Sequence, residues 1–581
     1  MLRNSCIKFL RRFYCNNSFH RVLITENNVI KEFQDKDLFK AKIVQERFSD
    51  ESGSTVKANR IQLLSDDLNC VGCGSHLQCD SVFQEGYVSP EVYATIYEAS
   101  PLHSSICLRC VKMREHQKYL EITVSFEEFC QLIKEIQNKT ALILYVLDVM
   151  TFPINVYEQI LDLIGSNKKI LVVVNKLDVL PPDTPRSLEY LVRIRELVSK
   201  YFLNLLRGNL LDVQLVSAKT GFGLEALITS IQNKWKHKGD VYLIGSTNSG
   251  KSTLFNALLS SDFCKSKAQF LFDKATICNW PGTTLNFLRF PIRRPRPEFL
   301  KKRRHRLSNQ GYGVNLPMKL SDLEHGYIFG KCRTTVDEAQ SVLTFDSAKP
   351  WRLAAENLVS FEKKKLPRHQ RVASSYILKH YTEGRFLYDT PGIVLQNQHL
   401  PFLNAEFTDL FCSYEPIVPK PVHLSIFNYL FLGNSYVYFE FLDNERHCDH
   451  LFFTAIVPEK LPLRLISKRK VDMLSADITK LSSKYFKQEL PLISKVFYPQ
   501  ISHKKSVDVL LSDFGFLVVR APKHFNGVVK ITAATPGGLG MALREKSFIP
   551  YIDNCKASLK PKTNIYSVLK TFWLPKKASP S

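Results

Sequence analysis

Residues 245–252 have the types and spacing of a phosphate-binding loop. The pattern G-x-x-x-x-G-K-S is matched by Gly245, Gly250, Lys251 and Ser252. The run lies between a strand-like and a helix-like segment, where such a loop can point successive backbone N–H groups at a β-phosphate. Lys251 would reach the β- and γ-phosphate oxygens, and the Ser252 hydroxyl would bind Mg²⁺. The predicted phosphate-contacting set also contains Asn248, Ser249 and Thr253.

Two more loops have residue types that recognise guanine. An N-K-x-D motif is formed by Asn175, Lys176 and Asp178, directly after an apolar strand-like run. Asp178 can accept hydrogen bonds from guanine N1–H and its 2-amino group. Adenine lacks that donor pair, and an unpaired buried carboxylate is unfavourable. The Ala218 N–H would bind guanine O6, so we expect GTP and GDP as ligands. The second loop consists of Ser217, Ala218 and Lys219.

A D-T-P-G motif at 389–392 follows a further strand-like run. Asp389 would hold Mg²⁺ through water, and the Gly392 N–H would contact the γ-phosphate. A Thr-Thr pair between the phosphate loop and this motif could complete the Mg²⁺ shell, and we favour Thr284 over Thr283. The predicted catalytic set is Lys251, Thr284, Asp389 and Gly392.

These motifs occur in an unusual order along the chain. The guanine-recognition loops come first, followed by the phosphate loop, Thr284 and the motif at 389–392. Strand-like runs separated by helical patterns predict a parallel sheet of the α/β class. The order therefore predicts a circularly permuted P-loop GTPase domain. In such a domain the segment that senses the γ-phosphate leads directly into the C-terminal region.

Two C-x-x-C pairs predict a structural zinc site. The ligands would be Cys70, Cys73, Cys107 and Cys110. Four thiolates fill a tetrahedral zinc shell, so this Zn²⁺ would not be catalytic. The loop between the pairs is longer than usual, and four buried cysteines without metal remain the alternative. Other nearby ligand types are His76, Cys79 and His103.

The charge balance favours a polyanionic partner. The chain has 581 residues, with 79 Lys and Arg against 55 Asp and Glu, a net charge of +24. A field of this sign attracts RNA, although a solvated basic surface would give the same count. No apolar run is long enough to span a bilayer, while peripheral association with the mitochondrial inner membrane is compatible with the charge. Segment 1–25 is basic, contains no Asp or Glu and interleaves apolar residues, which predicts a mitochondrial presequence; a plain basic tail is the alternative.

The remaining organisation follows from composition. The zinc module and the GTPase domain precede a C-terminal region rich in Phe and Tyr, with short strand-like runs. We expect this mostly β (α+β) region to bind RNA or a partner. A basic stretch at 293–306 is predicted to touch rRNA, although such charge runs are usually solvated. The predicted divisions are presequence 1–25, linker 26–66, zinc module 67–118, GTPase domain 119–400 with a basic insertion at about 291–371, and C-terminal domain 401–581.

Together these features resemble the YqeH-type GTPases and their mitochondrial nitric oxide-associated branch. The likeness rests on the two cysteine pairs, the loop at 245–252, Pro281-Gly-Thr-Thr-Leu285, His325-Gly-Tyr-Ile-Phe-Gly330 and Tyr388-Asp-Thr-Pro-Gly-Ile393. It implies a GTPase that assists assembly of the small ribosomal subunit in the mitochondrial matrix, through rRNA. By position it also implies that Asn248 is a K⁺ ligand, with a turn-forming Asn as the alternative.

Two hypotheses about activity follow from one position. Ile393 stands where Ras-like enzymes carry the glutamine that orients water, and an apolar side chain cannot do this. The first hypothesis is therefore a slow GTPase that needs K⁺ or a partner. The second is a nucleotide-gated RNA-binding scaffold with little intrinsic activity.

Overall fold

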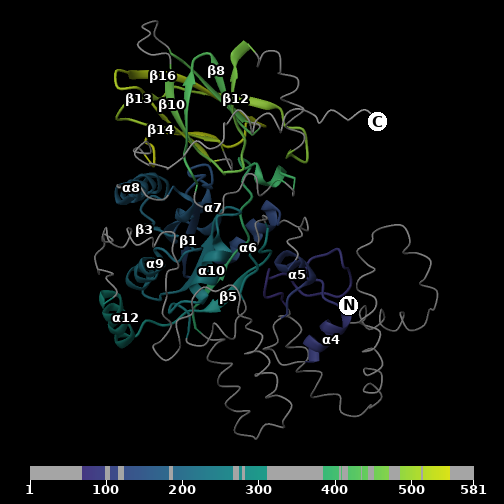
Figure 1. Cartoon of the computed structure of the whole chain (residues 1–581). Coiled ribbons are helices and arrows are strands. Elements are labelled where there is room, and N and C mark those ends of the chain that lie inside the picture. The colour runs from purple at the N-terminus through teal and green to yellow at the C-terminus, as the bar shows by residue number, and fades with distance from the viewer. Residues whose placement is uncertain are drawn as a thin grey trace, which may run out of the picture. The chain divides into compact units, whose positions relative to one another are not determined.

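A computed structural model shows how these segments fold (Figure 1). It comprises two compact units, Met1–Leu120 and Glu121–Ser581. The predicted presequence, the linker and residues 310–371 of the predicted insertion lie outside the described residues. The structure describes residues 69–98, 105–115, 124–181, 187–265, 274–277, 282–309, 384–404, 407, 417–433, 435–441, 450–469, 485–511 and 515–549.

The described part of the first unit contains the two cysteine pairs. Its described helices are α4 (Pro90–Glu98) and α5 (Leu108–Glu115). The chain also forms β-bridges between Asn69 and His76 and between Gln78 and Tyr87. Within residues 69–98 and 105–115 these helices and β-bridges are the regular elements that the structure describes.

The second unit contains a six-stranded sheet with the order β3-β2-β1-β4-β6-β5. Neighbouring strands are parallel except for β5 and β6, which pair antiparallel. The predicted parallel sheet is thus confirmed for five of the six strands. The strands are β1 (Ala141–Asp148), β2 (Lys169–Asn175), β3 (Leu210–Leu215), β4 (Asp240–Ile244), β5 (Leu288–Pro291) and β6 (Phe386–Asp389).

Helices cover both faces of this sheet, which explains the nearly continuous apolar sequence of β1. Its residues alternate between two buried clusters: Ile143, Tyr145 and Leu147 face one, and Leu142, Leu144 and Val146 face the other. The first cluster includes α6 (Phe126–Gln137), α7 (Ile160–Ile164) and α8 (Ser187–Leu205), and the second includes α9 (Leu224–Ser230) and α10 (Lys251–Leu259). A π-helical turn, Ile231–Trp235, extends α9.

The C-terminal region is a β-sandwich, which confirms that this region is rich in strands. Two antiparallel sheets, with the orders β17-β14-β15-β10-β7 and β11-β8-β9-β16-β12, enclose a third apolar cluster. The strands are β7 (Lys420–Ser425), β8 (Asn428–Leu432), β9 (Ser435–Phe441), β10 (His450–Ile456), β11 (Leu463–Ser467), β12 (Leu492–Phe497), β13 (Gln500–Ser502), β14 (Val507–Leu511), β15 (Phe516–Arg520), β16 (Asn526–Pro536) and β17 (Met541–Arg544).

The start of the predicted insertion differs from the expectation. Residues 291–309 pack onto the six-stranded domain instead of leaving it: Ile292 N–H donates to the Arg385 carbonyl at 2.9 Å, and Arg293 N–H donates to the Phe263 carbonyl at 2.9 Å. Helix α12 (Pro297–Asn309) follows. The charge run alone did not reveal this because the anchoring partners are distant in sequence. Among the described residues, no helix is long and apolar enough to cross a membrane.

Candidate functional site

The phosphate loop connects β4 to α10 and packs closely against its neighbours. Gly250 has φ +87°, and a Cβ there would lie 2.3 Å from the side-chain nitrogen of Asn175. A Cβ on Gly392 would lie 2.8 Å from the Cα of Thr247. Both positions therefore require glycine for reasons of space, and Gly250 also for its backbone conformation. The loops at 245–252 and 389–392, both predicted to hold phosphate, therefore pack directly against each other.

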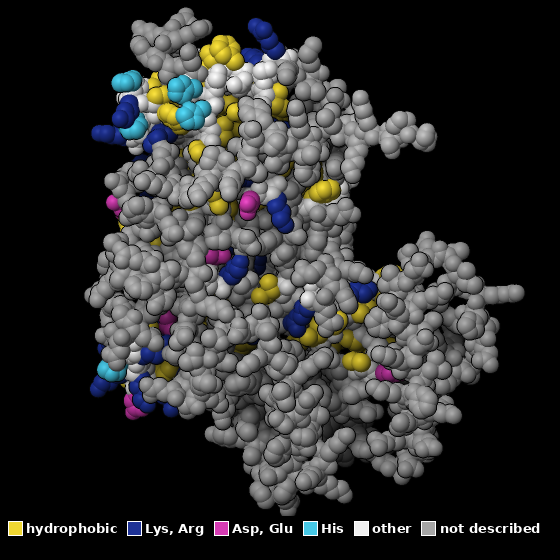
Figure 2. Space-filling view, in the orientation of Figure 1, with side chains coloured by type: hydrophobic (Ala, Val, Ile, Leu, Met, Phe, Trp, Pro, Cys, Tyr) yellow, Lys and Arg dark blue, Asp and Glu magenta, His cyan; other side chains and the backbone are white. Residues whose placement is uncertain are grey.

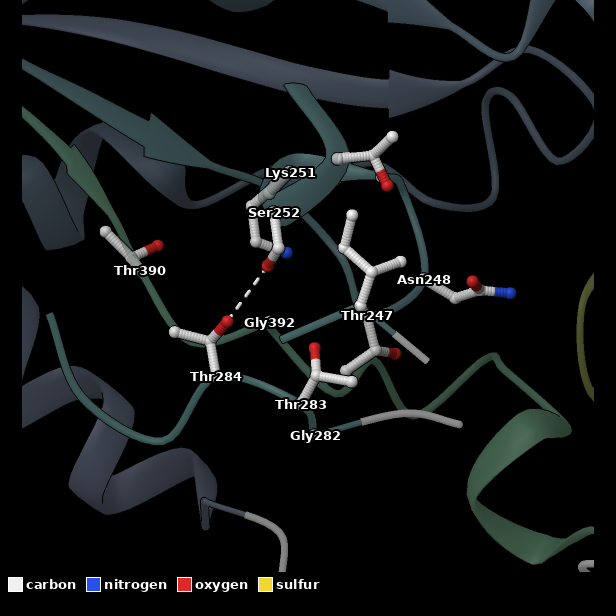
Figure 3. Close-up of a pocket in the computed structure, with 12 residues that line it drawn as sticks. Thr247, Asn248, Lys251, Ser252, Gly282, Thr283, Thr284, Thr390 and Gly392 are labelled. Carbon is white, nitrogen blue, oxygen red and sulfur yellow. Dashed lines mark hydrogen bonds between the residues drawn. The ribbon is translucent and has the colours of Figure 1, made fainter. Parts of the chain in front are cut away.

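A pocket opens at this loop (Figure 3). It brings together most of the predicted phosphate-contacting residues, without Gly245 and Ser249, with the Thr-Thr pair and with Thr390 and Gly392, although these segments are far apart in sequence. Asn248 lies at its edge with a left-handed backbone, φ 58°. The lining residues are Thr247, Asn248, Gly250, Lys251, Ser252, Thr253, Ile277, Gly282, Thr283, Thr284, Thr390 and Gly392.

Lys251 is buried beneath the loop. Its ammonium group donates to the carbonyl oxygens of Gly245 at 3.1 Å and Ser246 at 2.9 Å. Burial lowers the pKa of Lys251 to about 8, while the nearby Asp389 carboxylate opposes that shift. A phosphate that replaced the two carbonyl contacts would supply full negative charge to this poorly solvated cation.

Three oxygens that could bind a divalent cation lie together. The Ser252 hydroxyl donates to Asp389 Oδ2 at 2.7 Å, and the Thr284 hydroxyl donates to the same oxygen at 3.1 Å. The two hydroxyl oxygens are 2.9 Å apart, a contact that is marked by the dashed line in Figure 3. Asp389 Oδ1 is buried and has no hydrogen-bond partner among the described residues. Burial raises the pKa of Asp389, against the lowering effect of Lys251. A carboxylate with an unsatisfied oxygen beside two hydroxyls fits Mg²⁺, which prefers hard oxygen ligands.

The guanine-recognition loops are joined to the phosphate loop through Asn175. Its side-chain oxygen accepts from Ala218 N–H at 2.9 Å, and its side-chain nitrogen donates to the Ser249 carbonyl at 2.9 Å. The Ala218 N–H, which sequence analysis assigned to guanine O6, is thus directed at Asn175 in this structure. Asp178 accepts a hydrogen bond from the Ser217 hydroxyl at 2.6 Å. The neighbouring Lys219 side chain is exposed.

Sequence reasoning missed two polar partners of this site. Lys176 pairs with Asp148 Oδ2 at 2.8 Å, and Thr247 donates to Gln398 Oε1 at 3.2 Å. Asp148 ends β1, immediately beside the strand that carries the N-K-x-D motif, so a carboxylate at a strand end was an available signal. Nothing in the sequence pattern marks Gln398, because its partner is more than a hundred residues away.

Ile393 takes part in the site through its backbone. Its N–H donates to the Gly245 carbonyl at 3.0 Å, and its carbonyl accepts from Thr247 N–H at 2.9 Å. The side chain is 1% exposed and belongs to the apolar cluster on the α6–α8 side of the sheet. Ile393 therefore joins two loops, and its side chain is directed into the core.

The four predicted zinc ligands form one buried group in the first unit. Their sulfur atoms all lie within 4.8 Å of one another. Cys70 and Cys110 are 3.8 Å apart, as are Cys73 and Cys107. Thiolates at about 2.3 Å from a tetrahedral Zn²⁺ would be separated by about 3.8 Å, so the group is compatible with structural zinc. His76 is exposed and outside the group, Cys79 is also outside it, and His103 lies beyond the described residues.

Comparisons with known proteins agree with this geometry. Residues 240–301 match the family model described as 50S ribosome-binding GTPase. The chain is 29% identical to human nitric oxide-associated protein 1 over 563 residues, which is 87% of this chain and 78% of that protein.

Two shorter relatives cover less of the chain. Uncharacterized protein YqeH of Bacillus subtilis is 28% identical over 223 residues, 38% of this chain and 55% of that protein. The Arabidopsis thaliana protein named NO-associated protein 1, chloroplastic/mitochondrial, is 29% identical over 203 residues, 33% of this chain and 35% of that protein. These matches confirm the resemblance drawn from the motifs, and they indicate a P-loop GTPase domain, which implies GTP or GDP and Mg²⁺.

Proposed function

We propose that this chain, which is similar to nitric oxide-associated protein 1 and YqeH, hydrolyses GTP to GDP and phosphate in domain 119–400. The observation that carries this proposal is the oxygen cluster of Ser252, Thr284 and Asp389 beside the buried Lys251. Oxygen atoms that could bind Mg²⁺, next to the buried ammonium group of Lys251, are suited to a nucleoside triphosphate.

Each residue has a proposed role in this reaction. Lys251 stabilises the negative charge that develops on the β- and γ-phosphate oxygens, and the Gly392 N–H orients the γ-phosphate. Bound Mg²⁺, held through Ser252, Thr284 and Asp389, would neutralise phosphate charge. Asp178 selects guanine, and Asn175 fixes the spacing between the base loops and the phosphate loop. The remaining proposed nucleotide contacts are Lys176, Ser217, Ala218, Lys219, Gly245, Asn248, Ser249, Gly250 and Thr253.

We also propose that the GTPase domain is circularly permuted. The order β3-β2-β1-β4-β6-β5 supports this, because the phosphate-loop strand β4 is central while the strands carrying the base loops precede it in the chain. Parallel strands that present their carboxyl ends to one edge can be reconnected without changing their packing. Residues after Gly392 then continue into the sandwich at β7.

The intrinsic rate is proposed to be low. Ile393 points its side chain into the core, so its side chain does not orient an attacking water. Positive charge from K⁺ at Asn248, or a group from the ribosome, would then be required for fast turnover. A nucleotide-gated RNA-binding scaffold is the second candidate function, favoured by the same position of Ile393.

The proposed setting is the mitochondrial matrix, where the protein would assist assembly of the small ribosomal subunit and hence translation. Support comes from the basic N-terminal segment, the net charge of +24 and the ribosome-binding description of the matched family. The organellar name of the Arabidopsis relative agrees with this location. The proposed partners are rRNA and the small subunit. Zinc at Cys70, Cys73, Cys107 and Cys110 would be structural, and peripheral contact with the inner membrane is compatible with the charge.

The test is nucleotide binding by the purified full chain, followed by turnover in KCl and in NaCl. We expect selective binding of GTP over ATP and faster turnover in KCl. Asp178→Asn should weaken GTP binding by about 100-fold or more, because the amide presents a donor to the guanine donors. Equal binding of ATP would contradict the proposal. GTP binding without turnover, even with small ribosomal subunits, would favour the scaffold.

A further inference from the structure

One face of the five-stranded sheet has two different halves. Side chains alternate along its strands, so every second residue faces the sandwich core and the others face outward. At one end of this outward face Ile456, Leu510, Phe516 and Val518 join the apolar cluster of the nucleotide-binding domain. At the other end the outward residues are of another kind. We call them the basic-aromatic face: His423, His450, Phe452 and Arg520.

These four side chains come from three neighbouring strands. Phe452 of β10 lies opposite His423 of β7 on one side and Arg520 of β15 on the other. The His423 and Phe452 ring centroids are 4.9 Å apart at 85°, and those of His450 and Phe452 are 5.4 Å apart at 87°. The two imidazole rings are 6.0 Å apart and inclined by 16°. Phe452 therefore supports two nearly parallel imidazole rings.

The charged side chains described on the three strands of this face are basic. Strands β7, β10 and β15 contain no Asp or Glu. The Arg520 guanidinium carbon lies 5.8 Å from the centroid of the Phe452 ring. His423 is exposed, and exposed basic side chains follow in the flanking loops, at Lys504, Lys505, Lys523 and His524. Figure 2 shows His side chains gathered with Lys and Arg over this part of the sandwich.

We infer that the basic-aromatic face binds single-stranded RNA, with bases stacked on the His423 and His450 rings and a phosphate held by Arg520. Sheet surfaces that combine flat rings with basic side chains bind single strands in this way, because every base has a face that can stack. This inference rests on the proposed function, which includes an RNA partner, and assigns that partner a surface.

Other ligands fit the face less well. The core of a protein–protein interface is ordinarily a larger apolar surface, whereas the aromatic side chains here lie beside basic side chains. A lipid surface would need protruding apolar side chains, whereas the apolar ring of this face, Phe452, is half-buried and the other two rings are imidazoles. Duplex RNA presents few base faces for stacking, which leaves a single strand as the occupant.

The experiment uses the full chain and a labelled RNA 12-mer of mixed sequence, with 2-aminopurine to report stacking. The His423→Ala/His450→Ala double variant should bind about 30-fold more weakly at constant salt, since each stacked base contributes at least about 1 kcal/mol. It should also lose the 2-aminopurine quench and keep its salt dependence. Arg520→Ala should reduce the slope of log affinity against log salt by about 0.7. The His423→Phe/His450→Phe variant should restore both affinity and quench, since it keeps flat rings.

A matched control lies elsewhere in the chain. The control His305→Ala removes an exposed imidazole of α12, outside the basic-aromatic face, and GTP binding confirms that each variant is folded. Unchanged RNA affinity in the folded double variant would overturn the inference and leave this face for a protein partner. Failure of the Phe variant to rescue would overturn the stacking role. Absence of RNA binding by the unmodified chain would overturn the inference and the RNA part of the proposed function, while GTP binding and turnover test the GTPase part separately.

Discussion

Two basic regions of the molecule hold their charges in different ways. Helix α12 carries a dense local run of Lys and Arg, but part of that run is internal: Arg303 is 4% exposed and pairs with Glu225 and Asp262. Arg306 pairs with the same two carboxylates, at 3.2 and 2.9 Å. The basic-aromatic face has no local run, and its basic side chains, His423, His450 and Arg520, come from separate strands. A count of basic residues along the sequence therefore overstates the exposed charge of α12 and does not reveal the basic-aromatic face.

The helix period explains the division within α12. Residues three apart lie on the same side of a helix, so Arg303 and Arg306 face the domain together. Lys301, Lys302 and Arg304 are exposed. Our expectation that the whole stretch 293–306 touches rRNA is therefore wrong for Arg303 and Arg306, whose guanidinium groups are bound to carboxylates of the nucleotide-binding domain.

Breaking the buried ion pairs of Arg303 with Glu225 and Asp262 should have the largest effect, which is on the free energy of unfolding. Arg303→Met would leave Glu225 and Asp262 with one buried cation fewer, and removing one partner of a buried ion pair typically destabilises by about 3–5 kcal/mol. We expect a clearly lower midpoint in urea denaturation and unchanged RNA affinity for the protein that remains folded. Arg304→Met, on the exposed side, should leave the midpoint nearly unchanged. Equal effects of the two variants would contradict the division of α12 into a buried side with Arg303 and an exposed side with Arg304.

The exposed part of α12 gives the next largest effect. If Lys301, Lys302 and Arg304 each contact a phosphate, replacing all three by Ala should reduce the salt slope of RNA binding by about 2, which is roughly tenfold in affinity at moderate salt. The 2-aminopurine quench should persist, because these residues offer no ring. Loss of the quench in the triple variant would show that stacking depends on α12, and would contradict the assignment of stacking to the basic-aromatic face.

A buried cation in the nucleotide pocket provides a third test. Burial lowers the pKa of Lys251 to about 8, so without nucleotide its charge is lost as the pH rises through that value. Only the charged form attracts phosphate, so GTP affinity should fall by up to about tenfold per pH unit above pH 8. Titrations of GTP binding between pH 7 and pH 10 measure this. A GTP affinity that does not change with pH would mean that Lys251 keeps its proton throughout. RNA affinity measured over the same pH range serves as the control, since Lys251 lies in the nucleotide pocket and outside the basic-aromatic face.

The sequence predicted most of the nucleotide pocket and little of the surface around it. Lys251, Ser252, Thr284 and Asp389 belong to short motifs whose spacing is local, and the structure brings them together. Their tertiary partners could not be foreseen, because they depend on which strands pair and in which register. Phe452 meets His423 and Arg520 only through that pairing. The burial of Arg303 likewise depends on where α12 packs.

The smallest expected effect concerns the link between the pocket and the sandwich. Gln398 accepts a hydrogen bond from Thr247 of the phosphate loop, and the neighbouring His399 ring contacts the Pro536 carbonyl of β16 at 2.8 Å. Gln398→Ala removes a bond worth about 1 kcal/mol, so GTP affinity should fall by about fivefold.

RNA affinity measured without nucleotide should not change in this variant, since Gln398 is not part of the basic-aromatic face. RNA bound there should alter GTP affinity through this link, and linkage requires GTP to alter RNA affinity by the same factor. Gln398→Ala should reduce both factors equally. If instead the coupling survives in this variant and disappears in the α12 triple variant, then α12 is the region through which RNA reaches the nucleotide site.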